Sequence, residues 1–561
     1  MKLRARHRVH ACSCFSHASV RRGRRSVGAS GVLVASVALM VGSLAVVAAA
    51  DATQPVKAVG SSALADSAPV GVLTVGPAPE LSGTQPALRT PARPAGAFIN
   101  RPTMSMSAYE AAKAAAAADH GVHKPPAPPA NVSTAFAPTA KGFRGITQSQ
   151  SDGFFPPGVN GVVGGSFNVS TTNDRFVVYS KGTAPVVKKN VSLNTFFSYA
   201  AEALFDPRVV YDPVWKRFVT EADAFEESGT TQILGISVTK SGDPTKGTWN
   251  YLINGKQVCG TDVFVDYPQI STTQDAVLLT VNCFRDSDGA YLGSRAFAVA
   301  KSILYNGLGF TVPVFSPGDA TATPPNVLDG NPRAHLLVTG GGTAVRDVTW
   351  TDPQAGFYST MSAPVNITGF QTVVLPPDAR QAGCSTTSCR IDTGDARFAS
   401  PSTQINDDLW NATTYGFAGG TSFSAPYWGD FDVEGAGADT TKQFGVRFLA
   451  SNSDDYNVSL VSGADGRMFM TWSSSSPTAF VSQAVAARKA TDAAGTLPTL
   501  LVPFTSSATL TGDFDSNLGV QGWGKTSQIT RDTTDTTAWA WNEIVANPSE
   551  WGTFSARFVV P

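Results

Sequence analysis

The sequence predicts an all-β fold: a β-propeller of six or seven four-stranded blades, of which we favour seven. Short apolar runs rich in Val, Ile, Phe, Thr and Tyr recur from about residue 151 to Pro561, separated by Gly, Pro, Asn and Asp. Groups of four such runs return about every 40–60 residues, which is the spacing of propeller blades. A body of roughly 400 residues is too large for one β-sandwich.

Two groups of runs define the blades most clearly. RVVYD, RFVTEADAF, TQILGISVTK and TWNYLI predict one blade, and PQISTT, AVLLTVNCF, SRAFAVAKSIL and FTVPVF predict the next. Further groups begin near residues 161, 333, 398, 456 and 523. Because a propeller hides its sheet edges by closing the ring, the C-terminal strand FSARFVV should pair with a neighbour or with the N-terminal blade. Trp541 and Trp551 should then be buried between blades.

The stretch FDPRVVYDPVWKRFV contains two Asp-Pro steps. Asp212-Pro213 fits the first two positions of a type I turn, where the Asp side chain caps the turn and Pro presets φ. This turn would join RVVYD to RFVTEADAF. Asp206-Pro207 bounds the entry to the first of these strands. We interpret both steps as structural.

The N-terminal third of the sequence has a different texture. Residues 1–50 combine a basic stretch, an uncharged apolar run and a small-residue cleavage site after Ala50, which predicts a secretory signal peptide. The apolar run is also long enough for an uncleaved membrane anchor. Residues 51–150 predict an Ala/Pro-rich spacer with one short helix in SAYEAAKAAAAADHG, and residues 151–561 the propeller domain. We therefore expect a secreted, extracellular monomer that has no membrane contact after cleavage.

The charge balance argues against nucleic acid as a partner. Eight of the 42 Lys and Arg, and none of the 43 Asp and Glu, lie in the first fifty residues, so the remainder carries about nine excess negative charges. An acidic surface repels phosphate backbones.

Cysteine usage agrees with export. Four cysteines remain outside the predicted signal: Cys259, Cys283, Cys384 and Cys389. An even number in a secreted chain predicts disulfides, and proximity in sequence favours Cys259–Cys283 and Cys384–Cys389. A zinc site made of cysteines would usually show tight CxxC pairs, which are absent.

An ordered series of segments resembles a group of secreted bacterial sialidase-like β-propeller proteins. PPGVNGVVGGSFNV and RFVVYSK resemble their first blade, FDPRVVYDPVWKRFV and DYPQIS the following ones, and ARFASPSTQINDDLWNAT and the closing WGKTSQITRDTTDTTAWAWNEIV later ones. The resemblance covers most of residues 153–560 and implies a propeller fold and export. The sequence departs from the group at Gly158 and Val159, where Asp and Thr are expected.

Sialidase-type catalysis needs three arginines for the substrate carboxylate, a nucleophile paired with Glu, and an acid. Arg208, Arg333 and Arg397 each begin a predicted inner strand, with Glu221 and Asp223 near Arg208 in sequence. The FRIP-type arginine motif of sialidases is missing. Arg208 is therefore also our candidate ligand contact in a binding protein without a catalytic centre, where its planar guanidinium would bind a carboxylate or sugar oxygens.

Metal and triad chemistry find little support in the sequence. Only His335 belongs to the propeller, so any Ser-His-Asp triad would depend on it alone. Asp513, Asp515 and Asn517 alternate as calcium ligands do, yet no Glu stands at the twelfth position and ordinary acidic turns explain them. We expect no cofactor, with calcium as the one alternative.

Two functions remain open. The first is an extracellular binding or surface-interaction module whose partner is a glycan, an acidic polymer or a protein. The second is a sialidase-like glycoside hydrolase. Convergence of Arg208, Arg333 and Arg397 in space would favour the second.

Overall fold

The structure is a computed structural model that describes residues 66–79, 87–88, 101–118, 120–121, 139–224, 232–340, 344–371, 374–417, 420–421, 423–434, 438–533 and 536–560. All of them belong to one compact unit, Ala63–Pro561. The predicted signal peptide lies outside the described residues. Within the described ranges, no helix is both long and apolar enough to span a bilayer.

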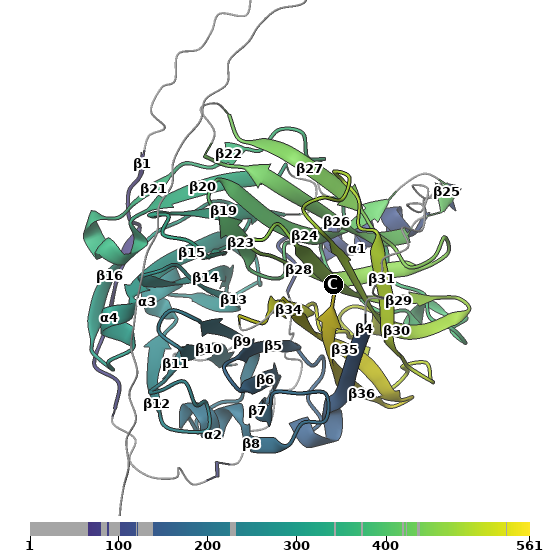
Figure 1. Cartoon of the computed structure of the whole chain (residues 1–561), viewed down its shortest axis with the longest axis horizontal. Helices are drawn as coiled ribbons and strands as arrows, with labels where there is room; N and C mark the ends of the chain where they lie inside the picture. The colour runs from purple at the N-terminus through teal and green to yellow at the C-terminus, as the bar shows by residue number, and fades with distance from the viewer. Residues whose placement is uncertain are drawn as a thin grey trace, which may run out of the picture. The chain divides into compact units, whose positions relative to one another are not determined.

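The chain forms a seven-bladed β-propeller, as the sequence predicts (Figure 1). The first blade contains β5 (Asn160–Gly164), β6 (Phe167–Thr172), β7 (Arg175–Ser180) and β8 (Val187–Ser192). The second contains β9 (Leu204–Asp212), β10 (Arg217–Ala224), β11 (Ile233–Thr239) and β12 (Thr248–Asn254). The third contains β13 (Val263–Thr272), β14 (Ala276–Arg285) and β15 (Tyr291–Ala300).

The fourth blade contains β17 (Thr321–Thr323), β19 (Arg333–Thr339), β20 (Arg346–Thr351), β21 (Thr360–Ser362), β22 (Val365–Asn366) and β1 (Asp66–Ser67). The fifth contains β18 (Pro325–Val327), β23 (Ser402–Ile405), β24 (Asp408–Phe417), β26 (Phe423–Asp432) and β27 (Thr440–Val446). The sixth contains β28 (Asp454–Ser462), β29 (Met468–Ser476), β30 (Ala479–Arg488) and β31 (Thr499–Thr505). The seventh contains β34 (Gln528–Arg531), β35 (Ala538–Asn547), β36 (Glu550–Val559) and β4 (Thr139–Thr147).

Three two-stranded pairs and short helices complete the described chain. The pairs are β2 (Gly71–Val75) with β16 (Phe310–Val314), β3 (His120–Gly121) with β25 (Gly420–Thr421), and β32 (Phe514–Asp515) with β33 (Val520–Gln521). The helices are α1 (Met106–Ala118), α2 (Leu193–Phe197), α3 (Lys256–Cys259) and α4 (Lys301–Leu304), with 3-10 turns η1 (Gln148–Ser151), η2 (Pro353–Tyr358) and η3 (Thr387–Cys389).

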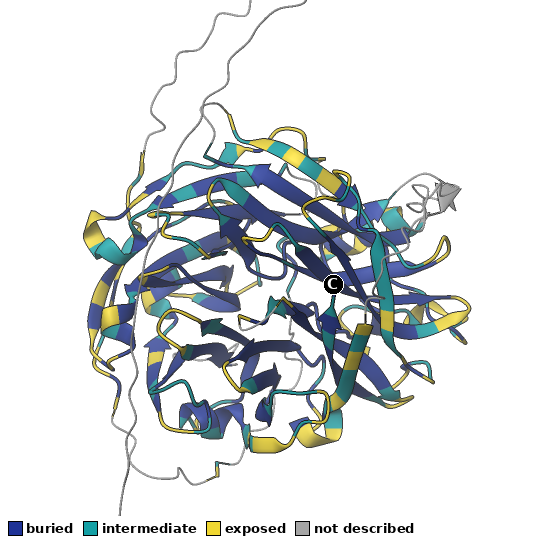
Figure 2. Ribbon diagram, in the orientation of Figure 1, coloured by how far each residue is buried: buried dark blue, intermediate teal, exposed yellow. Residues whose placement is uncertain are grey.

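The innermost strands form a closed ring. Going round it, β5 contacts β9, β9 contacts β13, β13 contacts β18, β18 contacts β23, β23 contacts β28, β28 contacts β34 and β34 contacts β5. Figure 1 shows β5, β9, β13, β23, β28 and β34 gathered about the centre, with the outer strands of the blades around them. Buried residues fill the strands, while exposed ones concentrate in turns and on outer strands (Figure 2).

The ring is closed by a strand from the N-terminal part of the chain. β4 pairs antiparallel with β36, from Gly552 opposite Thr147 to Val559 opposite Thr139. The predicted pairing of the C-terminal strand is therefore confirmed. Trp541 and Trp551 are both fully buried, as expected. The Trp541 ring packs on Gly161, where an added Cβ would lie 2.5 Å from the ring, so blades one and seven meet closely.

Two predicted strand positions differ from the structure. FTVPVF forms β16, which pairs with β2, and only an isolated bridge between Ala296 and Phe315 links this region to β15. Arg333 begins the second strand of its blade, β19. The three-residue strand β17 pairs with β19 and is the inner strand of that blade. A strand this short has no visible alternation in the sequence, which is why the group near residue 333 was predicted to start with the inner strand.

Both predicted disulfides, Cys259–Cys283 and Cys384–Cys389, are present. The turn interpretation of Asp212-Pro213 is confirmed too, because Asp212 Oδ1 accepts the backbone N–H groups of Val214 (2.9 Å) and Trp215 (3.2 Å). The other carboxylate oxygen of Asp212 binds buried Lys301 at 2.7 Å, which ties this hairpin to the start of α4.

Candidate functional site

The ring of inner strands surrounds the centre of the propeller, and different side chains lie at its two ends. We call the face at which these strands begin the start face, and the face at which they end the end face. Two predicted site residues belong to the start face: Arg208, at the middle of β9, contacts the approach to β23, and Arg397 lies five residues before β23. The cavity described below lies at the end face.

Arg208 joins three blades. Its Nε donates to the Pro268 carbonyl of β13 at 3.2 Å, and its Nη1 donates to the Ala399 carbonyl before β23 at 3.2 Å. Arg208 is buried, with 4% of its surface exposed. Its side chain thus bridges the second, third and fifth blades, an arrangement in which two of its donors already have protein partners.

Tyr267 lies between two arginines. The guanidinium carbons of Arg208 and Arg397 are 5.2 Å and 4.3 Å from the centre of its ring, within cation–π range. Arg397 also forms a two-point ion pair with Asp395, through Nε at 2.7 Å and Nη2 at 2.6 Å. Burial by itself would raise the pKa of Asp395, but Arg397 outweighs it and holds that pKa well below its usual range.

Three buried carboxyl groups surround Arg208. Glu221 lies directly opposite Arg208 on β10, and Asp223 and Asp206 lie on the same two strands. Burial raises the pKa of Glu221 and of Asp223 well above their usual range. Burial and nearby Asp266 raise the pKa of Asp206 to about 7, against the opposing effect of Arg208. Burial is the largest cause of the raised pKa in all three carboxyl groups, because it disfavours their charged form.

The start-face groups belong to a repeated local structure. Asp206, Tyr267 and Asn457 have φ of 46°, 56° and 54°, each at a register shift of its inner strand. Such β-bulges turn a backbone N–H out of the ladder. The N–H of Asp206 binds Asn173 Oδ1 at 2.7 Å, and that of Asn457 binds Thr414 Oγ1 at 2.9 Å, each on the preceding blade. In the sequence these bulges fall at the first residue of the segments DPRVV, YPQIS and NVSLV, which precedes the apolar part of each inner strand.

Arg333 lies apart from this cluster. It is half-exposed at the start of β19, and its closest carboxylate is Glu434, 3.7 Å away. The structure therefore brings Arg208 and Arg397 together on Tyr267, whereas Arg333 begins a second strand that runs antiparallel to the inner one.

His335 is enclosed by two carboxylates. Its Nδ1 lies 2.8 Å from Asp347 Oδ2, and its Nε2 lies 3.1 Å from Glu434 Oε1. Burial would lower the pKa of His335, but these two carboxylates raise it to about 9. With both ring nitrogens engaged, the imidazole has no nitrogen left to take a proton from a nucleophile.

We expect His335 to make the stability of the protein pH-dependent. A group whose pKa is raised on folding stabilises the fold fully below its unfolded pKa, about 6.5, and loses that contribution as pH rises toward about 9. The loss should amount to about 3 kcal/mol. Denaturant unfolding of wild type and His335→Gln at pH 6 and pH 9.5 measures it. An equal pH dependence in both proteins would show that His335 is neutral in the fold.

The carboxylates of the calcium candidates accept hydrogen bonds from the protein. Asp515 Oδ1 accepts the N–H of Asn517 at 2.8 Å, and Asp513 Oδ1 accepts from Gln148 at 2.7 Å. Across the residues that the structure describes, no group of three or more His, Cys, Asp or Glu is placed to hold a metal ion.

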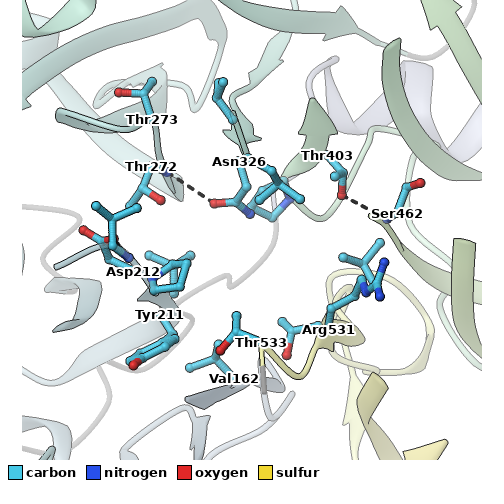
Figure 3. Close-up of a pocket in the computed structure, with 18 of the residues that line it drawn as sticks. Val162, Tyr211, Asp212, Thr272, Thr273, Asn326, Thr403, Ser462, Arg531 and Thr533 are labelled. Carbon is cyan, nitrogen blue, oxygen red and sulfur yellow. Dashed lines mark hydrogen bonds between the residues drawn. The ribbon is translucent and has the colours of Figure 1, made fainter. Parts of the chain in front are cut away.

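A cavity of about 410 Å³ opens at the end face (Figure 3). The ends of the inner strands line it, and its polar lining is dominated by neutral hydroxyl and amide groups: Thr272, Thr273, Asn326, Thr403, Ser462 and Gln528. Two hydrogen bonds between blades shape its wall, from the Thr272 N–H to Asn326 Oδ1 at 3.2 Å and from the Ser462 N–H to Thr403 Oγ1 at 3.2 Å.

The charged residues of the cavity already have partners. Arg531 is bound by Asp465 through both guanidinium nitrogens, and Asp329 accepts the backbone N–H groups of Asn331 and Asn406. Tyr211 is different, because its hydroxyl has no hydrogen-bond partner among the described residues. Its ring rests on Gly164, where an added Cβ would lie 2.3 Å away. Sequence reasoning missed this site, since most of its residues are neutral and they come from strand ends far apart in the sequence.

Comparisons with solved structures find similarities at low sequence identity and low TM-score. No family model and no curated protein matches the sequence. Similar solved structures include the GH93 α-L-arabinofuranosidase of Fusarium graminearum with arabinobiose (10% identity, 76% of this chain and 97% of that one, TM-score 0.35). Another is an exo-β-1,3-galactanase from Phanerochaete chrysosporium with galactose (10% identity, 74% and 96%, TM-score 0.29). An ACO/RPE65 chimera also matches (11% identity, 62% and 73%, TM-score 0.34).

Proposed function

We propose that the protein is an extracellular β-propeller binding module and that it holds a glycan in the end-face cavity. The cavity carries the proposal. At about 410 Å³ it lies within the usual range of ligand pockets, and it combines apolar strand ends with convergent hydroxyl and amide groups. Because its charged residues are engaged within the protein, the lining suits uncharged sugar hydroxyls better than an acidic polymer.

Tyr211 is the side chain we expect to contact the glycan most directly. Its unpaired hydroxyl can donate or accept a hydrogen bond, and its ring offers an apolar face at the cavity wall. Removing one hydrogen bond to a ligand costs about 0.5–1.5 kcal/mol, which corresponds to roughly 2- to 13-fold in affinity. We expect Tyr211→Phe to weaken binding by that factor and Tyr211→Ala to weaken it further.

A glycan array of neutral and acidic oligosaccharides, followed by calorimetry on the strongest hit, tests this expectation. Tyr358→Phe is the matched control, because Tyr358 is 91% exposed in η2 and lies outside the cavity lining. If the wild type binds a glycan and Tyr211→Ala binds it equally well, the ligand lies elsewhere. If no glycan on the array binds the wild type, the ligand is not a glycan of the kinds tested.

The alternative is a sialidase-like glycoside hydrolase that works at the start face. One observation favours it: glycosidases need a carboxylic acid that stays protonated near neutral pH, and Asp206 has its pKa raised to about 7 beside Arg208 and Arg397. Hydrolysis of a fluorogenic sialoside by the wild type, lost in Asp206→Asn, would support this alternative. In that case Arg208 would be the contact of an acidic substrate.

A further inference from the structure

A segment of the chain itself lies on the start face. Residues 101–113, which we call the strap, run into α1 and contact the approach to β23. The Thr103 N–H and hydroxyl donate to Asp395 Oδ2 at 3.1 Å and 3.4 Å, and Arg397 Nη2 donates to the Arg101 carbonyl at 2.6 Å. The strap therefore covers the Asp395–Arg397 ion pair.

The helical part of the strap is held by two side chains. Tyr109 Oη donates to Asp392 Oδ1 at 3.0 Å. Lys113 Nζ donates to Thr393 Oγ1 at 2.8 Å and lies 3.1 Å from Asp378 and 3.7 Å from Asp392. Tyr109 and Lys113 are buried, at 3% and 8% exposure, and are one helical turn apart, so they lie on one face. Alanines occupy most of the remaining helix, with Glu110 exposed.

The chemistry of the two partners is complementary in sign. The strap supplies an ammonium group, N–H and O–H donors and the Arg101 guanidinium, whose charge lowers the pKa of Asp266 against the larger effect of burial. The propeller supplies the carboxylates of Asp378, Asp392 and Asp395, of which Asp395 also pairs with Arg397 and Asp392 lies 3.7 Å from Lys525. Burial would raise the pKa of Asp392, but Lys525 and Lys113 hold it below its usual value.

The floor under the strap retains buried polar atoms that the strap does not reach. Tyr267 Oη and Arg397 Nη1 have no hydrogen-bond partner among the described residues. Both residues are at least 95% buried. Unpaired buried polar groups are costly and are usually satisfied by a ligand or water. These atoms indicate a site whose occupant can offer more polar groups than the strap does.

We propose that the start face is a docking site for a basic peptide, and that the strap occupies it as an intramolecular competitor. Charged and polar contacts hold the strap, so its affinity should fall with salt. A basic peptide from a partner protein can then exchange with it. This proposal concerns the opposite face from the glycan cavity and does not depend on the glycan.

The test uses the full chain and a fluorescein-labelled peptide of residues 101–118. In the double variant Tyr109→Ala/Lys113→Glu the strap loses both buried contacts. We expect the peptide to bind this variant at least about tenfold more tightly than it binds the wild type, because the wild-type strap competes. Raising the salt concentration from about 0.05 M to 0.5 M should weaken binding several-fold. Adding Asp392→Asn to the double variant should also weaken peptide binding, because it removes the charge that Tyr109 and Lys113 of the peptide would contact.

Two controls separate docking from loss of fold. Glu110→Gln, on the exposed side of α1, should behave as the wild type. A peptide carrying Lys113→Glu should bind neither protein. If the double variant does not show wild-type near-UV circular dichroism, the single variant Lys113→Gln replaces it. Failure of the peptide to bind a correctly folded strap variant would overturn the proposal, and the strap would then be a fixed part of the fold.

Discussion

Replacing Arg208 with alanine should lower the free energy of unfolding by about 3–5 kcal/mol, the usual cost of removing one partner from a buried charged network. The substitution removes two hydrogen bonds that join β9 to Pro268 and Ala399, and it removes one of the two cations on the Tyr267 ring. Chemical denaturation followed by tryptophan fluorescence measures the change, because ten tryptophans are spread along the chain.

Arg333→Ala is the matched control. Arg333 is half-exposed and its carboxylate partner is 3.7 Å away, so its loss should cost less than about 1 kcal/mol. Arg208→Lys should be intermediate, since lysine keeps the charge but cannot reach two carbonyls with a planar fork. An Arg208→Ala protein that melts as the wild type does, yet binds its ligand less tightly, would instead make Arg208 the ligand contact that the sequence predicts.

Deleting residues 551–561 should abolish cooperative unfolding. The deletion removes nearly all of β36, so β4 loses its partner, β35 loses one of its two partners, and the ring opens. It also removes Trp551, which is fully buried and donates to the Phe154 carbonyl at 2.8 Å. Calorimetry of the truncated protein should show a broad, low-enthalpy transition. A sharp transition at the wild-type temperature would show that closure contributes little to stability.

A single substitution tests the same closure from the other strand. At Gly142 an added Cβ would lie 2.1 Å from the Ser555 carbonyl oxygen, so Gly142→Val must push β4 away from β36. We expect a loss of about 3 kcal/mol or more, at the upper end of overpacking costs. Gly76→Ala is the control, because nothing lies within 4 Å of the Cβ it would add.

The blades were predictable where strands are long and alternate apolar residues with turn residues. All four strands of the second blade were predicted from their sequence runs, and both local disulfides followed from the spacing of the cysteines. The segment TAKGFRGIT was not predicted as a strand. Its glycines and its Lys and Arg carry no strand pattern, and it is a strand because β36 supplies its hydrogen bonds and leaves no room for a side chain at Gly142.

The candidate site was predictable only in part, for a related reason. Arg208 and Arg397 stand out in the sequence as charges before apolar runs, and the structure brings both onto Tyr267. The end-face cavity and the strap escape sequence reasoning, because each is made by residues from distant segments. The one local signal of the strap is Tyr109 and Lys113, four residues apart in an otherwise alanine-rich helix.

The pairing of β4 with β36 also has a consequence for biosynthesis. The ribosome makes β4 before any complete blade, but the residue that pairs with Thr147 is Gly552, roughly 400 residues later. At about 5–20 residues per second, β4 therefore remains without its partner for about 20–80 seconds of synthesis. Until then the nascent propeller is an open arc with one unpaired edge, so chaperones and proteases have access to it throughout that time. The last ten or so residues made decide whether the chain becomes a closed, protease-resistant ring.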